Sequence, residues 1–143
     1  MKYHFKIYKE GRGFWAECLE LEGLQTQGST KKELMMNMEE ALNLYLDEPE
    51  DSKVIFPLPN QKIRKASNIV DVHVYPAVAF SFFLRNSRLK QKLTQNQVRE
   101  KLGLKNIYSY QRLESSQTAN PELKTIVALK RIFPEMDLEE IVA

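Results

Sequence analysis

The chain has 143 residues, of which 43% are hydrophobic and 28% charged, and its formal net charge is +2. This composition suits one folded domain or two small ones. No apolar run approaches the roughly 18 residues that a membrane span needs. The first residues lack the apolar core of a signal peptide, so we expect a cytoplasmic protein. The single cysteine, Cys18, excludes an internal disulfide and a cysteine metal cluster.

The charge is distributed unevenly along the chain. Residues 76–143 contain 11 basic and 7 acidic side chains, whereas residues 1–75 contain 10 basic and 12 acidic ones. The second half is therefore better suited to contact with a polyanion such as nucleic acid. Because its positive excess is modest, we expect the affinity to depend on dimerisation as much as on one module.

The first half shows the period-two alternation of half-buried strands. Residues 2–9 alternate between two faces, and a turn with two glycines follows at 10–13. Residues 14–19 form a second predicted strand, so the two should pair as a hairpin. A short third strand is predicted over residues 24–27, between two glycines.

A helix and a fourth strand are expected to complete this half. Thr30 and Glu33 have the spacing of a capping box. Residues 47–68 lose periodicity and include an acidic run at 47–51, and a loop of this length is often functional. Residues 69–75 alternate again and should return to the sheet as a strand. Apolar residues at helical spacing should cover one sheet face; they are Leu34, Met38, Ala41, Leu42 and Tyr45.

Five helices are predicted in residues 76–143. Residues 93–114 indicate two short helices joined by a tight turn at Gly103. This layout is typical of a helix-turn-helix, whose second helix enters the DNA major groove. We expect Tyr110 to be buried. The side chains predicted to contact DNA are Asn106, Tyr108, Ser109, Gln111 and Arg112 in the groove, with Gln95 and Lys105 near phosphates.

Capping signals define the helix starts in this half. Thr94 and Gln97 form a capping box at the start of the first of these two helices. Asn120 and Pro121 have the pattern of an N-cap followed by proline at the first helical position. The helix that they start should bury Leu123, Ile126, Val127 and Leu129.

The segment 78–84 is apolar on nearly every face. A helix within a five-helix module needs only one apolar stripe. The surplus predicts a contact between two copies of the chain, formed by Val78, Phe80 and Leu84. Additional packing within one chain explains the same pattern equally well.

Three short motifs occur in order in the first half: Trp15-Ala16-Glu17, Gly23 to Gly28, and Glu40-Ala41-Leu42. They resemble the W-A-E, G-x-x-T-Q-G and E-A-L elements of the HicB antitoxin family, and residues 53–60 are similar to that family after its helix. The C-terminal part resembles the helix-turn-helix found on many members. The resemblance implies an α+β protein: a βββαβ domain similar to a partial ribonuclease-H fold over 1–75, then a five-helix helix-turn-helix domain over 76–143.

The resemblance also implies a function. HicB-like proteins are antitoxins of type II toxin–antitoxin systems that block a HicA-like toxin, a small ribonuclease that cleaves messenger RNA. With their DNA-binding domain they repress their own operon, here as a homodimer or a tetramer. No cofactor is implied. We expect Trp15, Glu17, Asp47 and Glu48 to contact the toxin, although a solvated loop explains the acidic pair equally well.

Two positions depart from the helix-turn-helix pattern. Arg99 stands where such repressors usually have a small residue, and one extra residue lies between Gly103 and the stretch 110–114. The strand acids Glu17 and Asp71 form no cluster suited to Mg²⁺, so we expect neither an enzyme nor a metal site. The alternative function is a stand-alone repressor whose N-terminal domain senses a ligand or dimerises.

Overall fold

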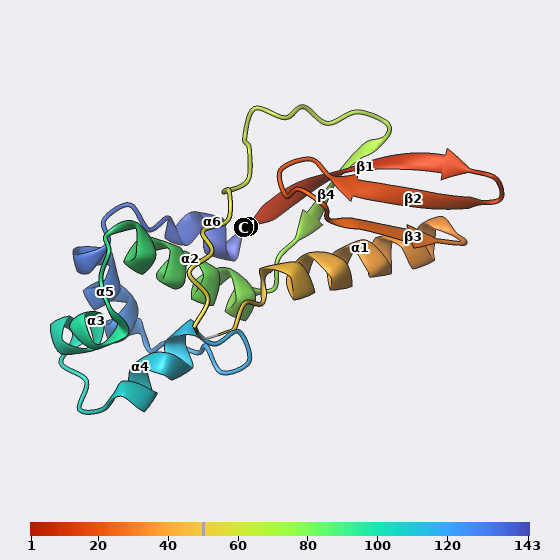
Figure 1. Ribbon diagram of the computed structural model, residues 1–143. Coiled ribbons are helices and arrows are strands. Elements are labelled where there is room, and N and C mark those ends of the chain that lie inside the picture. Colours follow the sequence, from red (N-terminus) through yellow and green to blue (C-terminus); the bar gives the residue numbers. More distant parts are fainter. Residues whose placement is uncertain (50) are drawn as a thin grey trace. The chain divides into compact units, whose positions relative to one another are not determined.

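The computed structural model describes residues 1–49 and 51–143, and the chain divides into two compact units (Figure 1). None of the described helices is long and apolar enough to cross a membrane. The predicted α+β class, with a sheet first and helices after it, is confirmed. Each unit combines two stretches of chain: Met1–Leu46 with Phe56–Tyr75, and Asp47–Ile55 with Pro76–Ala143. The segment Asp47–Ile55 thus belongs to the helical unit, whereas the sequence placed it with the sheet.

The first unit is an antiparallel four-stranded sheet with one helix on one of its faces (Figure 1). The helix is α1 (Lys31–Leu46). In space the strands follow the order β3-β2-β1-β4, so β3 and β4 are the two edges. The strands are β1 (Lys2–Glu10), β2 (Gly13–Cys18), β3 (Gln25–Gly28) and β4 (Ile69–His73).

The core of this unit lies between α1 and the sheet. Gly28 allows the close approach, because an added Cβ there would lie 2.5 Å from the backbone nitrogen of Leu34. The predicted capping pattern is modified at the start of α1. Thr30 Oγ1 accepts from the backbone N–H of Glu33, but the Glu33 carboxylate accepts from Ser29 rather than from Thr30. Fully buried core side chains are Tyr3, Phe5 and Ala16 from the sheet and Leu34, Met38 and Leu42 from α1.

Side-chain hydrogen bonds hold the non-periodic stretch before β4 in place. The Tyr3 hydroxyl donates to the carbonyl of Pro57 at 2.7 Å. Glu20 accepts from the backbone N–H of Asn60 at 3.1 Å and from the backbone N–H of His4 at 2.9 Å. The His4 ring also bonds to Glu20, with Nδ1 at 2.8 Å, and His4 is 9% exposed although its position in the alternation puts it on the face away from α1.

The described residues of the second unit form five helices, as the sequence predicts (Figure 1). Its core is formed by side chains from all five helices and from the turn after α5; they are Phe82, Leu84, Val98, Tyr110, Leu129, Phe133, Met136 and Ile141. The helices are α2 (Pro76–Lys90), α3 (Gln95–Leu102), α4 (Ile107–Glu114), α5 (Leu123–Ile132) and α6 (Leu138–Val142).

The boundaries of α3 and α4 follow from local chemistry. Both bonds of the predicted capping box are present: Gln97 N–H donates to Thr94 Oγ1 at 3.1 Å, and Thr94 N–H donates to Gln97 Oε1 at 2.7 Å. Gly103 ends α3 at a φ of +70°, in the left-handed region that favours glycine. Asn106 is the N-cap of α4, and its Oδ1 accepts from the Ser109 N–H at 2.9 Å.

The predicted start and buried face of α5 are wrong. The N–H groups of Thr125 and Ile126 donate to the carbonyl of Glu122, so the first turn closes there and not at Asn120. Leu123 is 76% exposed and Val127 45% exposed, whereas Leu129 is buried. Of the four predicted positions, only Leu129 is fully buried.

The helix α2 uses its surplus of apolar side chains within the chain. Val78, Phe80 and Leu84 are 7%, 5% and 0% exposed, and Phe82 and Phe83 pack edge to face. A contact between two copies through Val78, Phe80 and Leu84 stays a prediction, which the burial of these side chains within one chain does not require. The alternative from the sequence, additional packing within one chain, accounts for them.

Candidate functional site

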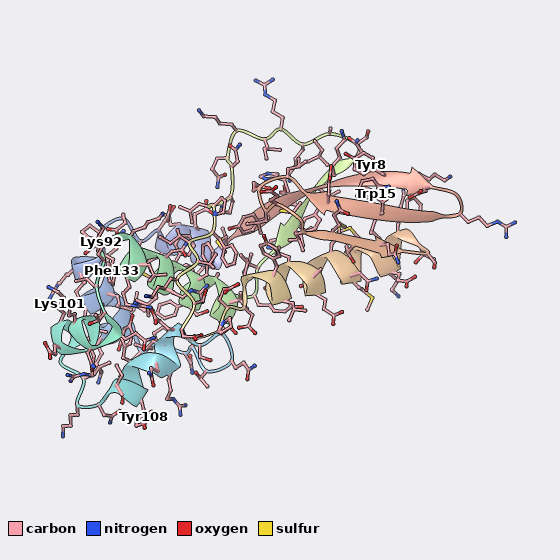
Figure 2. All side chains as sticks on the ribbon, viewed as in Figure 1. Tyr8, Trp15, Lys92, Lys101, Tyr108 and Phe133 are labelled. Carbon is pink, nitrogen blue, oxygen red and sulfur yellow. The ribbon has the colours of Figure 1, made fainter. Side chains whose placement is uncertain are left out.

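The helices α3 and α4, with the turn between them, present the predicted contact residues on an exposed surface. We name this part, residues 94–114, the α3–α4 element. Tyr108 is 74% exposed, and Figure 2 shows it on the outer side of α4. Tyr110, two residues later, is fully buried, as predicted. Lys105, Asn106, Ser109 and Arg112 are also exposed, whereas Gln95 and Gln111 are half-buried.

Arg99 closes the turn of the α3–α4 element. Its Nη1 donates to the carbonyl of Leu104 at 2.9 Å, and its Nε donates to Asn96 Oδ1 at 3.0 Å. A long side chain is accommodated at this position because the guanidinium satisfies a turn carbonyl instead of entering the helix contact. The departure from the usual small residue therefore stabilises the turn.

A buried carboxylate organises the inner side of the element. Glu114 accepts from the Arg88 Nε at 2.6 Å, from the Gln95 Nε2 at 2.6 Å and from the Tyr110 hydroxyl at 3.0 Å. Gln111 Nε2 in turn donates to Gln95 Oε1 at 3.2 Å. The two glutamines are thereby held in fixed positions next to the exposed side chains of α4. No pattern in the sequence indicated Arg88 or the role of Glu114, because the two residues are 26 apart in the chain.

Electrostatics agree with a charged Arg88–Glu114 pair. Burial lowers the pKa of the Arg88 guanidinium, but the hydrogen bonds to Glu114 and the negative charge of Glu114, with a smaller contribution from Tyr110, together outweigh burial and leave that pKa raised. Burial also raises the pKa of Tyr110, which therefore stays a neutral hydrogen-bond donor to Glu114. The pair thus supplies a fixed anion that can orient amide groups.

The residues that cap the start of α4, Asn106 and Ser109, bond to each other. Asn106 Oδ1 accepts from both the N–H and the hydroxyl of Ser109. No hydrogen bond within the described part of the chain uses the Asn106 amide nitrogen, so this group can donate to an external acceptor. Lys105 directly precedes this cap and Arg112 lies in the last turn of α4, and both are exposed cations suited to phosphate contact.

A second surface lies on the sheet face opposite α1. The rings of Tyr8 and Trp15 stack with centroids 4.2 Å apart and planes 13° apart, and Figure 2 shows them on neighbouring strands. Lys6 Nζ lies 5.3 Å from the Tyr8 ring. The Tyr8 hydroxyl donates to Glu17 at 2.8 Å, and this hydrogen bond is the main cause of the raised pKa of Tyr8. These residues form an aromatic surface that is bordered by the ammonium of Lys6 and the carboxylate of Glu17.

The structure divides the predicted toxin contacts between the two units. Trp15 and Glu17 lie on β2 in the first unit, whereas Asp47 and Glu48 belong to the second. Asp47 accepts a hydrogen bond from the Ser116 hydroxyl. The last part of the acidic run includes Glu50, which lies outside the described residues.

The strand acids that a metal-dependent nuclease would need already have partners. Glu17 is bonded to Tyr8. Asp71 contacts the Lys65 ammonium at 2.8 Å, which lowers the pKa of Asp71. The two carboxylates are on different strands, and β1 lies between those strands.

No protein-family model matches the chain, and no curated protein matches it.

Proposed function

We propose that this chain is an antitoxin that also represses transcription by binding DNA. The DNA-binding part is carried by one observation: the exposed side chains of α4 sit directly above a buried network that fixes Gln95 and Gln111. In this proposal the α3–α4 element is a helix-turn-helix and α4 enters the major groove. Tyr108, Gln111 and Arg112 reach base edges, while Gln95 and Lys105 contact phosphates.

Charge and exposure support this assignment. Three cations of the element, Lys101, Lys105 and Arg112, are exposed, and its buried Glu114 is neutralised by Arg88. The element therefore presents positive charge outward, as phosphate contact requires. A dimer would read two half-sites about 34 Å apart, or a multiple of that distance.

The toxin-binding part of the proposal rests on the resemblance to HicB antitoxins and on the sheet surface. In this proposal the first unit is a partial ribonuclease-H-like domain that has lost catalytic acids and acts as a binding module. The stacked Tyr8 and Trp15 offer a rigid aromatic surface, the kind of surface that dominates binding energy at protein interfaces. Glu17 at its border would meet a basic residue of a HicA-like ribonuclease.

Two measurements test the two parts separately. For the first, the full chain is titrated onto the DNA upstream of its own gene and onto a scrambled duplex at several salt concentrations. We expect tighter binding to the upstream DNA, with affinity that falls as salt rises. Equal affinity for both duplexes would contradict sequence-specific repression.

For the second, the chain is co-expressed with the reading frame adjacent to its gene, and growth and co-purification are measured. We expect rescue of growth and a stable complex. Trp15→Ala should weaken both without changing DNA binding, whereas Tyr108→Ala should do the reverse. If cells that express the adjacent reading frame grow equally well with and without this chain, the antitoxin assignment is contradicted. The proposal of DNA binding is not affected by that result.

A further inference from the structure

The outer edge of β4 and one side of α1 border an apolar groove of about 360 Å³. Met35 and Met36 on α1 are 42% and 63% exposed, although they lie beside the buried Val72 of β4. Exposed methionines next to an open strand edge suit an interface, because their flexible side chains adapt to a partner. The groove is lined by Lys32, Met35, Met36, Glu39, Asp71, Val72 and His73.

The backbone of β4 has hydrogen-bonding groups that point outward along this groove. Val74 N–H donates to Met1, and Ile7 N–H donates to Asn68, so the even-numbered residues of this stretch bond to β1. The odd-numbered residues Asp71 and His73 therefore direct their N–H and C=O groups away from β1. No described strand lies beside this edge. Such an edge accepts another extended strand.

The chain itself covers the two ends of that edge. At one end the outward N–H of Ile69 donates to the carbonyl of Ala66 at 3.2 Å, and the other end is covered by α1. Asn43 of α1 donates to the carbonyl of His73 at 3.2 Å, and its Oδ1 accepts from the N–H of Tyr75 at 2.7 Å. The N–H and C=O of Asp71 and the N–H of His73 have no such cover among the described residues. These groups define where an added strand would bond.

The groove is self-complementary under a two-fold axis. Along β4 it presents an acid, an apolar residue and an imidazole: Asp71, Val72 and His73. A second β4, antiparallel and centred on Val72, would place Asp71 of each copy opposite His73 of the other. Isologous interfaces require this kind of reciprocal matching.

The helix α1 shows the same kind of pattern, with apolar side chains between two residues of opposite charge. Lys32 and Glu39 stand at the two ends of the exposed row on α1, with Met35 and Met36 between them. Two α1 helices related by the same axis would run antiparallel, so Lys32 of one copy would meet Glu39 of the other. Neither side chain has an ion-pair partner within the described part of the chain. Unlike charges at such positions favour one register over others.

From these observations we propose that two copies of the chain join through their β4 edges into one continuous antiparallel sheet, with Met35 and Met36 of both copies packed at the centre.

The other edge of the sheet, β3, is less suited to pairing with a second copy. At β3 the outward carbonyl of Gln27 is already taken by the Asn37 amide at 2.7 Å, and the neighbouring side chains are polar. This inference rests on the first unit and does not depend on DNA or toxin binding.

The test is the dimer dissociation constant of the full chain, measured by sedimentation equilibrium. His73→Pro removes an outward N–H and no bond to β1, and proline is tolerated on edge strands. We expect it to weaken the dimer by about tenfold or more, which is about 1.4 kcal/mol. Circular dichroism checks that the variant folds.

Charge variants test the register independently of folding. Lys32→Glu and Glu39→Lys should each weaken the dimer, and the double variant should recover it, because the swapped charges again meet their opposites. A wild-type chain that stays monomeric overturns the proposal. So does a dimer that is indifferent to His73→Pro, or a double variant without recovery. A dimer broken only by Phe80→Asp would place the contact at the groove between α2, α5 and α6 instead.

Discussion

Glu114, the last residue of α4, accepts two hydrogen bonds from the Arg88 guanidinium of α2, from Nε at 2.6 Å and from Nη2 at 3.2 Å. Their side chains are 4% and 8% exposed. The pair joins the proposed DNA-reading helix to the longest helix of its unit. Because Glu114 also holds Gln95, the same contact links stability to the shape of the proposed DNA surface.

Removing one partner of this pair should be costly. Arg88→Met leaves the Glu114 carboxylate buried without its cation, and such a change destabilises proteins by about 3–5 kcal/mol. The measurement is urea unfolding, with the exposed Arg112→Met as the matched control. The double variant Arg88→Met/Glu114→Gln should lose less than Arg88→Met alone. Equal unfolding midpoints for Arg88→Met and Arg112→Met would contradict a buried pair.

Gln95 should couple the network to DNA affinity. Gln95→Ala removes the donor to Glu114 and the acceptor for Gln111, so Gln111 loses its fixed orientation. We expect weaker binding to the upstream DNA by about 1–3 kcal/mol, the range for a lost specific contact. Gln117→Ala, in the exposed loop after α4, is the control and should bind as the wild type does. Identical affinities for the two variants would exclude a role for the network in recognition.

Cys18 should be unreactive in the folded chain. The residue is 8% exposed, and burial raises the pKa of its thiol to about 11. The thiolate fraction at neutral pH is therefore roughly a hundredfold lower than for an ordinary thiol. Alkylation by iodoacetamide should be slow at neutral pH and should become fast in urea. Rapid alkylation of the folded protein would show that the site opens.

The Lys65–Asp71 pair predicts a small acid sensitivity. The hydrogen bond from Lys65 to Asp71 holds the folded-state pKa of Asp71 below the ordinary value of 3.8. The contribution to stability is therefore complete above about pH 4 and is lost as the pH falls through the lower folded pKa. Lys65 is 73% exposed, so at most about 1 kcal/mol is expected. Lys65→Met should flatten this part of the stability–pH curve; an unchanged slope would assign the acid sensitivity elsewhere.

Local sequence signals predicted most of the fold because the deciding interactions are short-range. The alternation of residues 2–9 gave β1, and the Thr94–Gln97 capping box gave the start of α3. The start of α5 could not be predicted in the same way. Asn120 and Pro121 have the right residue types for a helix start, but the first turn closes on Glu122, and this depends on how the preceding loop packs.

The candidate site shows the same division. Helical spacing separated the buried Tyr110 from the exposed Tyr108. The Arg88–Glu114 bond could not be predicted, since it joins residues 26 apart in the sequence and depends on the packing of α2 against α4. The apolar residues of α2 correctly indicated that this helix is buried. They gave no information about whether the residues that bury it belong to the same chain or to a second copy.

The most direct test of the central claim is a salt-dependent titration of the upstream DNA with Lys105→Ala, Arg112→Ala and Arg12→Ala. Arg12 is an exposed cation in the β1–β2 turn, so its variant removes the same charge from the other unit. We expect Lys105→Ala to lower the salt slope by roughly one and Arg112→Ala to reduce affinity by about 1–3 kcal/mol with a loss of sequence preference. Arg12→Ala should bind as the wild type does. Three variants with the same affinity and the same salt slope would contradict DNA binding through the α3–α4 element.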